Sequence, residues 1–321
     1  MTYVTNKLYG TFVRRGFMDA IRAVYRELMC IYYRRIVKKQ YVKRDIYDYE
    51  MILDLYDRGI SRALWLFGKR ELDHKYLMER VLSPGDRVLD VGANIGYYAL
   101  MESNLVGPTG MVVALEPSPE NIKLLETNIE LNNCQNVKVT ENAVSNVAGK
   151  SVFWLSNESN LNTFHRHLLE EHGNLKGSIE VNVTTVSDLT KKYGPFDLLR
   201  MDIEGHEVQV LQNIGDMLEE GRVCPNIIFE THTRAYGHHN NIGVVLKQLT
   251  RGGYRVGYVS SSSHRGTEIL LNMGCQTITT IRTDDNYRTI HKDLTLEQLL
   301  SCLEGSGGIR TVFLEKPESR Q

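Results

Sequence analysis

One eleven-residue run, VLDVGANIGYY at residues 88–98, constrains the fold of this chain more than any other part of it. Its first residues have the largely apolar composition of the end of a buried strand, and residues 97 to about 105 show helical apolar periodicity. Between them, Gly92 and Gly96 predict a tight turn in which the backbone can approach a ligand closely. A strand, a glycine turn and a helix in this order indicate an α/β domain that cradles a nucleotide-containing cofactor.

The details of the turn predict which cofactor it holds. A dinucleotide site has the pattern G-x-G-x-x-G and places a pyrophosphate on the helix N-terminus, whereas here Gly92 is followed by Gly96 with three residues between them. Asp90 stands where the turn begins, and a carboxylate there would repel a diphosphate but attract a ligand that carries an ammonium and a sulfonium. We therefore predict S-adenosylmethionine as the cofactor, with the turn binding it through Asp90, Gly92, Ala93, Asn94 and Gly96.

Two further strand ends support this prediction. The apolar run 111–115 ends in Glu116, and an acid at the tip of a second strand can accept both ribose hydroxyls. A third strand is expected over 137–140, and the loop after it lies where an adenine ring would be held. Asn142 and Ala143 are the predicted adenine contacts in that loop, with Asn142 as a partner for the exocyclic amine.

The chain resembles the FkbM-type S-adenosylmethionine-dependent methyltransferases. Besides the glycine-turn run, the resemblance rests on LEPSPEN at 115–121, NAVSN at 142–146 and LLRMDIEGHEVQVL at 198–211. In that family the last motif usually reads K-x-D-x-E-G-x-E, and Arg200 stands at its lysine position, which keeps the positive charge but changes the donor geometry. The resemblance implies an O-methyltransferase that acts on a hydroxyl of a carbohydrate (glycan) or secondary metabolite.

The order of the expected elements predicts the α/β, Rossmann-like fold of class I methyltransferases, a seven-stranded sheet in the order 3-2-1-4-5-7-6. The remaining strands of that sheet are expected at 196–202, 226–230, 254–259 and 311–314, the last of them antiparallel. Two more extended runs, 151–155 and 178–186, are expected to pair near the sheet edge. The polar stretch 157–176 between them is expected to form a loop and helix over the active site.

We divide the chain into two parts. Residues 1–80 are predicted to form a mostly helical, basic extension with a short strand at 49–53, which in the family helps to cover the acceptor. Residues 81–321 are predicted to form the cofactor-binding domain. Within it, 260–308 is longer than a hairpin requires and is expected to be an insertion with a helix at 294–303.

Ligands in open α/β sheets lie beyond the carboxyl ends of the strands, so the catalytic candidates follow the fourth and fifth strands: Asp202, Glu204, Glu230 and His232. The sulfonium is an activated donor, so the protein must align the acceptor oxygen and remove its proton. In one mechanism His232 or Glu204 is the base and Glu230 orients the histidine. In the other, Asp202 and Glu230, with or without Glu204, hold Mg²⁺, which acidifies the acceptor hydroxyl. The histidine beside Glu230 favours the first.

The same motif has purely structural interpretations. Asp202, Glu204 or Glu207 can cap the helix expected from about residue 206, where free N–H groups and the helix dipole favour an acid. His232 can equally be an ordinary loop residue. Arg200 lies within a buried strand and should therefore have an acidic partner.

Residues 17–31 predict an amphipathic helix, with apolar side chains at helical spacing: Phe17, Ile21, Val24, Leu28 and Ile31. Its other face is basic, with Arg14, Arg15, Arg22, Arg26, Arg34 and Arg35, and residues 1–44 contain eleven lysines and arginines against two acids. Such a helix can lie on the inner, anionic face of a membrane as a peripheral contact. Alternatively, it docks on the catalytic domain or on the second subunit of a homodimer.

Charge and cysteine content exclude several classes of protein. A net charge of −1 provides no basic field for nucleic acid. Five scattered cysteines without a C-x-x-C pair indicate reduced thiols and, because no signal-peptide pattern is present, a cytoplasmic protein. Two other functions stay open. One is a non-catalytic cofactor-binding scaffold at a membrane surface, and the other is a nicotinamide-dependent oxidoreductase, which would need a third glycine.

Overall fold

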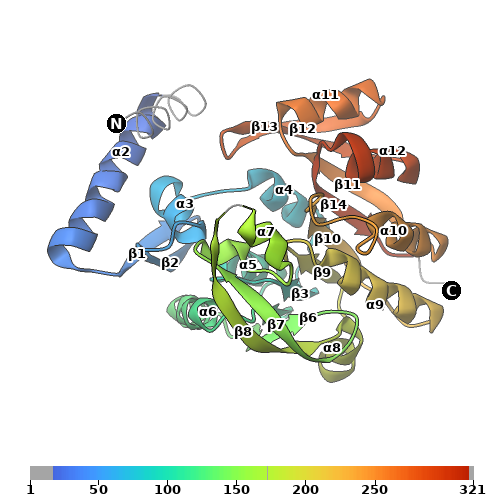
Figure 1. The fold of residues 1–321 in the computed structure, drawn as a ribbon, viewed down its shortest axis with the longest axis horizontal. Coiled ribbons are helices and arrows are strands. Elements are labelled where there is room, and N and C mark those ends of the chain that lie inside the picture. Colours follow the sequence, from blue (N-terminus) through green and yellow to red (C-terminus); the bar gives the residue numbers. More distant parts are fainter. Residues whose placement is uncertain (1–16, 172, 318–321) are drawn as a thin grey trace.

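The computed structural model describes residues 17–171 and 173–317, and a mixed sheet runs through the centre of this part of the chain (Figure 1). Nine strands of the described residues form it, in the spatial order β12 (Gln276–Thr283), β13 (Asn286–Lys292), β11 (Arg255–Ser261), β14 (Ile309–Glu315), β10 (Asn226–Glu230), β9 (Leu198–Met201), β3 (Arg87–Val91), β4 (Met111–Leu115) and β5 (Val137–Thr140). From β5 to β10 the neighbours are parallel, and β14 is antiparallel to both β10 and β11. The predicted order 3-2-1-4-5-7-6 is therefore confirmed as β5-β4-β3-β9-β10-β14-β11.

Strands β12 and β13 extend the sheet beyond the predicted seven. They form an antiparallel hairpin whose second strand pairs with β11, and both arise from the stretch 260–308 that was expected to be an insertion. The same stretch contains α11 (His264–Asn272) and α12 (Leu296–Ser301), which a π-helical turn η3 (Cys302–Ser306) follows. The predicted helix at 294–303 is thus present, and Thr295 and Gln298 form a reciprocal capping box at its start.

The two faces of the sheet are buried in two separate apolar clusters. Leu89, Leu199 and Phe229 belong to one cluster, and their neighbours Val88 and Leu198 belong to the other, as the alternation of side chains along a strand requires. The first cluster contains residues of α8 (Val186–Tyr193), α9 (Glu207–Glu219) and α10 (Ile242–Arg251), and the second contains residues of α5 (Tyr97–Val106) and α6 (Pro119–Leu131). Burial on both faces explains why most residues of these strands are apolar.

The N-terminal part comprises α2 (Phe17–Tyr32), the π-helical turn η1 (Tyr33–Val37), β1 (Tyr41–Ile46), β2 (Tyr49–Asp54), α3 (Ile60–Phe67) and α4 (Leu72–Val81). The predicted strand at 49–53 is β2, and its Ile52 N–H donates to Asn128 Oδ1 of α6 at 2.6 Å. Residues 1–16, with the predicted basic positions Arg14 and Arg15, lie outside the described residues. Within the described part of the chain, every helix is too short or too polar to cross a bilayer.

A second, three-stranded sheet contains β6 (Asn142–Val144), β8 (Leu175–Thr184) and β7 (Gly149–Ser156), in that order. Strands β7 and β8 pair with each other as predicted, and their orientation is antiparallel. They do so in this separate sheet rather than at the edge of the large one. The polar segment that joins them contains the short helices η2 (Ser159–Leu161) and α7 (Arg166–Glu170).

Candidate active site

The candidate site lies where the direction of strand addition reverses. From β3 the chain adds β4 and β5 on one side, whereas β9 and β10 lie on the other side. Such a switch point leaves a crevice at the carboxyl ends of the strands, where open α/β sheets bind ligands. A cavity lies in this crevice and is lined by residues at the ends of β3, β4 and β9.

Gly92 shapes the floor of the cavity. Its φ is +82°, and a Cβ atom at this position would lie 2.3 Å from the backbone oxygen of Asp202. A larger residue would push the ends of β3 and β9 apart, so only glycine closes this turn. The predicted cofactor-binding residues that line the cavity are Gly92, Asn94, Glu116, Asn142 and Ala143. The other turn residues, Ala93 and Gly96, belong to the turn and to the start of α5 without lining the cavity.

The prediction that Asp90 binds the cofactor from the glycine turn is wrong. Asp90 is a residue of β3 rather than of the turn, it is completely buried, and it does not line the cavity. Its Oδ1 accepts a hydrogen bond from Arg200 Nη1 at 3.1 Å, while Arg200 Nη2 reaches Asp202 Oδ2 at 3.2 Å and the guanidinium covers the ring of Tyr98. The predicted acidic partner of Arg200 is thus confirmed, and Asp90 is that partner. Asp202 and Glu204, together with Glu116, are the carboxylates that line the cavity.

Glu116 lies at the tip of β4 on the cavity wall. Its carboxylate accepts hydrogen bonds from the backbone N–H groups of Asn94 (3.0 Å) and Ser118 (3.0 Å) and from the amide of Asn121 (3.2 Å). Burial raises the pKa of Glu116 to about 7, although these donors oppose the shift. The site thus has a preformed acceptor that is fixed in orientation by three donors.

The segment after β7 covers the cavity, and its individual contacts escaped prediction. Ser159 O accepts hydrogen bonds from the side-chain amides of Asn94 and Asn121, each at 3.1 Å. Ser159, Asn160, Asn162 and Phe164 line the cavity together with Phe153 of β7. The polarity of this stretch predicted a cover over the site. The particular contacts depend on how the second sheet packs, which local sequence does not encode.

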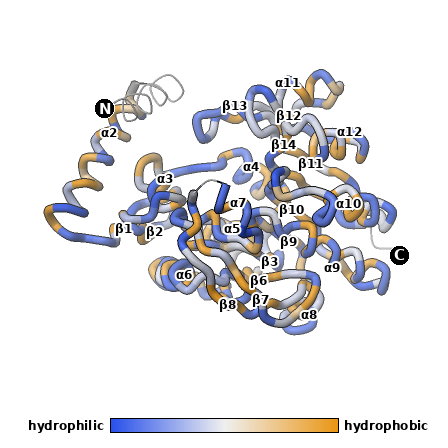
Figure 2. The backbone as a smooth tube through the Cα atoms, in the orientation of Figure 1, coloured by the Kyte–Doolittle hydropathy of each residue, from blue (hydrophilic) through white to orange (hydrophobic). Residues whose placement is uncertain are grey.

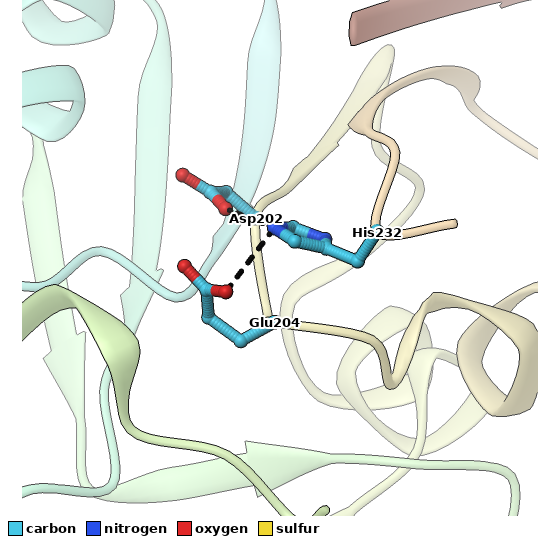
Figure 3. Close-up of side chains that lie close together, drawn as sticks. All are labelled: Asp202, Glu204 and His232. Carbon is cyan, nitrogen blue, oxygen red and sulfur yellow. Dashed lines mark ion pairs between the residues drawn. The ribbon is translucent and has the colours of Figure 1, made fainter. Parts of the chain in front are cut away.

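Three of the predicted catalytic residues converge beside the cavity (Figure 3). Asp202 follows β9, Glu204 lies in the loop before α9, and His232 follows β10. Nε2 of His232 is 3.4 Å from Glu204 Oε2 and 3.7 Å from Asp202 Oδ1. Glu204 has a φ of +50°, a left-handed conformation that is uncommon for a side-chain-bearing residue and concentrates at functional sites.

Glu207, the first residue of α9, orients His232. Its Oε1 lies 2.9 Å from Nδ1 of the imidazole, and its other oxygen accepts a hydrogen bond from the Tyr236 hydroxyl at 3.1 Å. It also accepts a hydrogen bond from the backbone N–H of Gly205, which precedes the helix. The N-cap of α9, His206, has no side-chain cap hydrogen bond, so the predicted capping role is not confirmed, whereas the orienting role was not predicted. With Nδ1 engaged by a carboxylate, Nε2 is the nitrogen that faces Glu204 and Asp202.

Glu230 was predicted to orient His232 or to share Mg²⁺ with Asp202, and the structure contradicts its placement for both roles. Its Oε1 forms an ion pair with Arg310 Nη1 at 2.9 Å, and Arg310 also reaches the buried Glu71 at 2.8 Å. Among the described residues, the group whose ligand atoms lie close enough to share a metal ion is Asp202, Glu204 and His232, within 4.8 Å of one another, and Glu230 is not part of it.

The electrostatics of the cluster follow from burying several acids together. Burial raises the pKa of Glu204 to about 7, although the neighbouring His232 opposes the shift. Burial also raises the pKa of Glu230 to about 8, against the pull of Arg310. For His232 burial acts in the lowering direction, but the Glu204 and Glu207 carboxylates outweigh it and hold its pKa well above 6.5. These carboxylates therefore make the imidazole of His232 a stronger base than an ordinary histidine.

The sheet order, the glycine turn and the strand-end acids define a class I S-adenosylmethionine-dependent methyltransferase. Residues 90–256 match the methyltransferase FkbM domain, and residues 33–144 match the protein-L-isoaspartate(D-aspartate) O-methyltransferase family. The chain is 30% identical to 31-O-demethyl-FK506 methyltransferase FkbM of Streptomyces tacrolimicus, over 65% of this chain and 88% of that one. It is 27% identical to methyltransferase sdnD of Sordaria araneosa, over 56% and 78% of the two chains.

The chain belongs to the FkbM methyltransferase family. Among solved structures, M. jannaschii TYW2 in complex with AdoMet aligns with 87% of this chain and 88% of its own at 12% identity and a TM-score of 0.40. Family membership identifies the protein as an enzyme that uses S-adenosylmethionine, in preference to the nicotinamide-dependent oxidoreductase and the non-catalytic scaffold.

Proposed function

We propose that this enzyme transfers the methyl group of S-adenosylmethionine to a hydroxyl oxygen of a carbohydrate or secondary metabolite. The observation that carries the proposal is the Glu207–His232 pair, which presents Nε2 of a strongly basic imidazole next to the cavity. The name of the Streptomyces relative also refers to an oxygen as the methylated position. A net charge of −1 suits an acceptor without phosphates.

When bound, S-adenosylmethionine supplies a methyl carbon that is already activated for displacement. The contribution of the chain is then to hold the acceptor hydroxyl in line and to remove its proton. Nε2 of His232 takes that proton as the new oxygen–carbon bond forms, and Glu207 stabilises the resulting imidazolium through Nδ1. Asp202 and Glu204 face the cavity and favour the cationic end of the cofactor over the neutral product.

We expect Glu116→Ala to weaken S-adenosylmethionine binding by roughly ten- to a hundredfold, because a buried acceptor for the ribose hydroxyls is lost. Isothermal titration calorimetry measures the effect directly. Glu120→Ala, at an exposed position in the first turn of α6, is the matched control and should bind as the unmodified enzyme does. If the two variants bind S-adenosylmethionine with equal affinity, Glu116 does not contribute to the cofactor site.

A metal ion is the alternative means of acidifying the acceptor, and the residues that could hold it are Asp202, Glu204 and His232. Because Glu207 already makes His232 a base, we expect activity to be the same after exhaustive chelation and without added Mg²⁺ or Mn²⁺. Loss of turnover in chelator, with recovery on adding either ion, would replace this mechanism by metal-assisted catalysis.

The acceptor class is tested with methyl-labelled cofactor and a panel of hydroxyl, carboxyl and amine acceptors, followed by mass spectrometry of the products. A methyl ether survives mild alkali, whereas a methyl ester is hydrolysed. Alkali-stable label on hydroxylated sugars or metabolites is expected. Alkali-labile label on peptides, or label on nitrogen alone, would refute the proposed O-methylation of hydroxyls.

A further inference from the structure

Helix α2 lies at one side of the molecule (Figure 1), and among the described residues one face of it packs against α3. That face is narrow and built from small side chains, since Ala20, Ala23 and Cys30 are its buried apolar residues. Two hydrogen bonds also hold this face in place. Arg26 Nη1 donates to the backbone oxygen of Trp65 at 2.9 Å, and the Trp65 indole N–H donates to the backbone oxygen of Arg26 at the same distance. The helix is therefore held in a defined orientation against α3.

The opposite face carries the large apolar side chains. Their exposed fractions are 60% for Met18, 47% for Ile21, 62% for Tyr25, 61% for Leu28 and 48% for Tyr32. Successive members are three or four residues apart, so they form one continuous stripe along the helix. Figure 2 shows hydrophobic and hydrophilic positions alternating along α2. Docking on α3 thus leaves the apolar stripe uncovered by the other described residues, and an exposed apolar patch of this kind marks an interaction surface.

Basic residues accompany the stripe. Residues 17–44 contain eight lysines and arginines against two acids, and the apolar surface continues into η1 through Ile36, which is 70% exposed. Asp19 lies 3.5 Å from Arg22, and Glu27 lies 2.8 Å from Arg62 of α3, so both acids already face a cation. Arg35 and Lys38 are exposed, and neither forms an ion pair with another described residue.

We propose that α2 and η1 bind the surface of an anionic lipid bilayer, with the stripe Met18–Tyr32 immersed at the headgroup level. A helix with an apolar face, flanking arginines and tyrosines lies in the plane of such an interface, where tyrosine places its ring and hydroxyl favourably. A second copy of the chain is a poorer occupant, because pairing two such stripes would bring two clusters of unpaired cations together. This inference is independent of the acceptor and of the catalytic mechanism.

The test measures partitioning of the full-length enzyme onto sedimented vesicles. Vesicles of phosphatidylcholine with phosphatidylglycerol should bind it at low salt, and vesicles of phosphatidylcholine alone should bind it at least about tenfold more weakly. Added salt should reduce binding to the anionic vesicles, because it screens the attraction. Failure of the wild-type enzyme to bind anionic vesicles better than neutral ones overturns the proposal.

Two variants separate the stripe from the charges. Leu28→Glu should lower the partition coefficient by at least about tenfold. The double variant Arg35→Gln/Lys38→Gln should have a lower partition coefficient on anionic vesicles, by about fivefold for each of the two residues. On neutral vesicles it should partition as the wild type does. Leu271→Glu on α11 and Lys247→Gln on α10, each exposed and remote from α2, are the matched controls.

All variants should keep the wild-type affinity for S-adenosylmethionine, which shows that they fold. Partitioning that the α2 variants leave unchanged overturns the proposal. It is also overturned if sedimentation velocity shows a dimer that Leu28→Glu dissociates while neither wild type nor variant binds anionic vesicles. In that case a second copy is the occupant.

Discussion

Replacing His232 by glutamine should lower kcat by roughly 10²–10⁴-fold, because the variant has no group that can take the proton of the acceptor hydroxyl. Glutamine is of similar size and can still hydrogen-bond to Glu207, so the loss isolates the basic function. His232 does not line the cofactor cavity, and the affinity for S-adenosylmethionine should therefore stay within about threefold of the wild-type value. Unchanged kcat would exclude His232 as the proton acceptor.

The pH dependence of kcat/KM tests the same role independently. Burial acts to lower the pKa of His232, but Glu204 and Glu207 outweigh it and raise that pKa well above 6.5. Since only the neutral imidazole accepts a proton, kcat/KM should increase as pH rises through the raised pKa and reach a plateau above it. Glu207→Gln removes one of the two carboxylates, so its rising limb should move to lower pH while the plateau falls.

Glu230→Gln is the comparison variant. Glu230 pairs with Arg310 and contributes less than Glu204 or Glu207 to the raised pKa of His232, so its limb should move less than that of Glu207→Gln. If the rising part of the pH profile of kcat/KM shifts equally in both variants, or in neither, the group that titrates there is not His232.

The second large effect is on stability. Arg200→Met should lower the free energy of unfolding by about 3–5 kcal/mol, measured by urea denaturation, because it leaves Asp90 as an unpaired charge in the interior. Asp90 is completely buried and Arg200 is 2% exposed, so water cannot replace the lost partner. Arg166→Met, which breaks an exposed pair with Glu170, is the control and should change stability by less than about 1 kcal/mol.

Two related variants locate the cause of this loss. Arg200→Lys restores the residue usual in the family, but a single ammonium cannot bond Asp90 and Asp202 in the way the guanidinium does, so an intermediate loss is expected. Adding Asp90→Asn to Arg200→Met removes the stranded charge and should recover part of the stability. A double variant no more stable than Arg200→Met would show that packing, not charge, is responsible.

Patterns within short stretches of the sequence were sufficient to predict much of the fold. Each strand of the predicted order follows from a short apolar run, and each turn from residues next to it, so β3, β4, β9, β10 and β14 lie where the sequence predicts them. The hairpin β12–β13 was missed because both strands are rich in polar residues, a composition that resembles a loop, and β12 (Gln276–Thr283) is also largely exposed. Likewise, β7 and β8 have strand character, but which sheet they join depends on packing.

The candidate site divides in the same way. Residues that are adjacent in the chain, such as those of the glycine turn or of the run after β9, are brought to the switch point by local chain geometry alone. The sequence by itself therefore determined the cofactor-binding turn. It also determined that Asp202, Glu204 and His232 lie near this turn. Only the tertiary structure decided how charges pair. Asp90 of β3 pairs with Arg200 of the neighbouring strand β9. Glu207 at the start of α9 contacts His232 after β10, and Glu230 pairs with Arg310 of β14. A buried charge pairs with an opposite charge that the fold places next to it. Which charge that is depends on how segments distant in the sequence pack together.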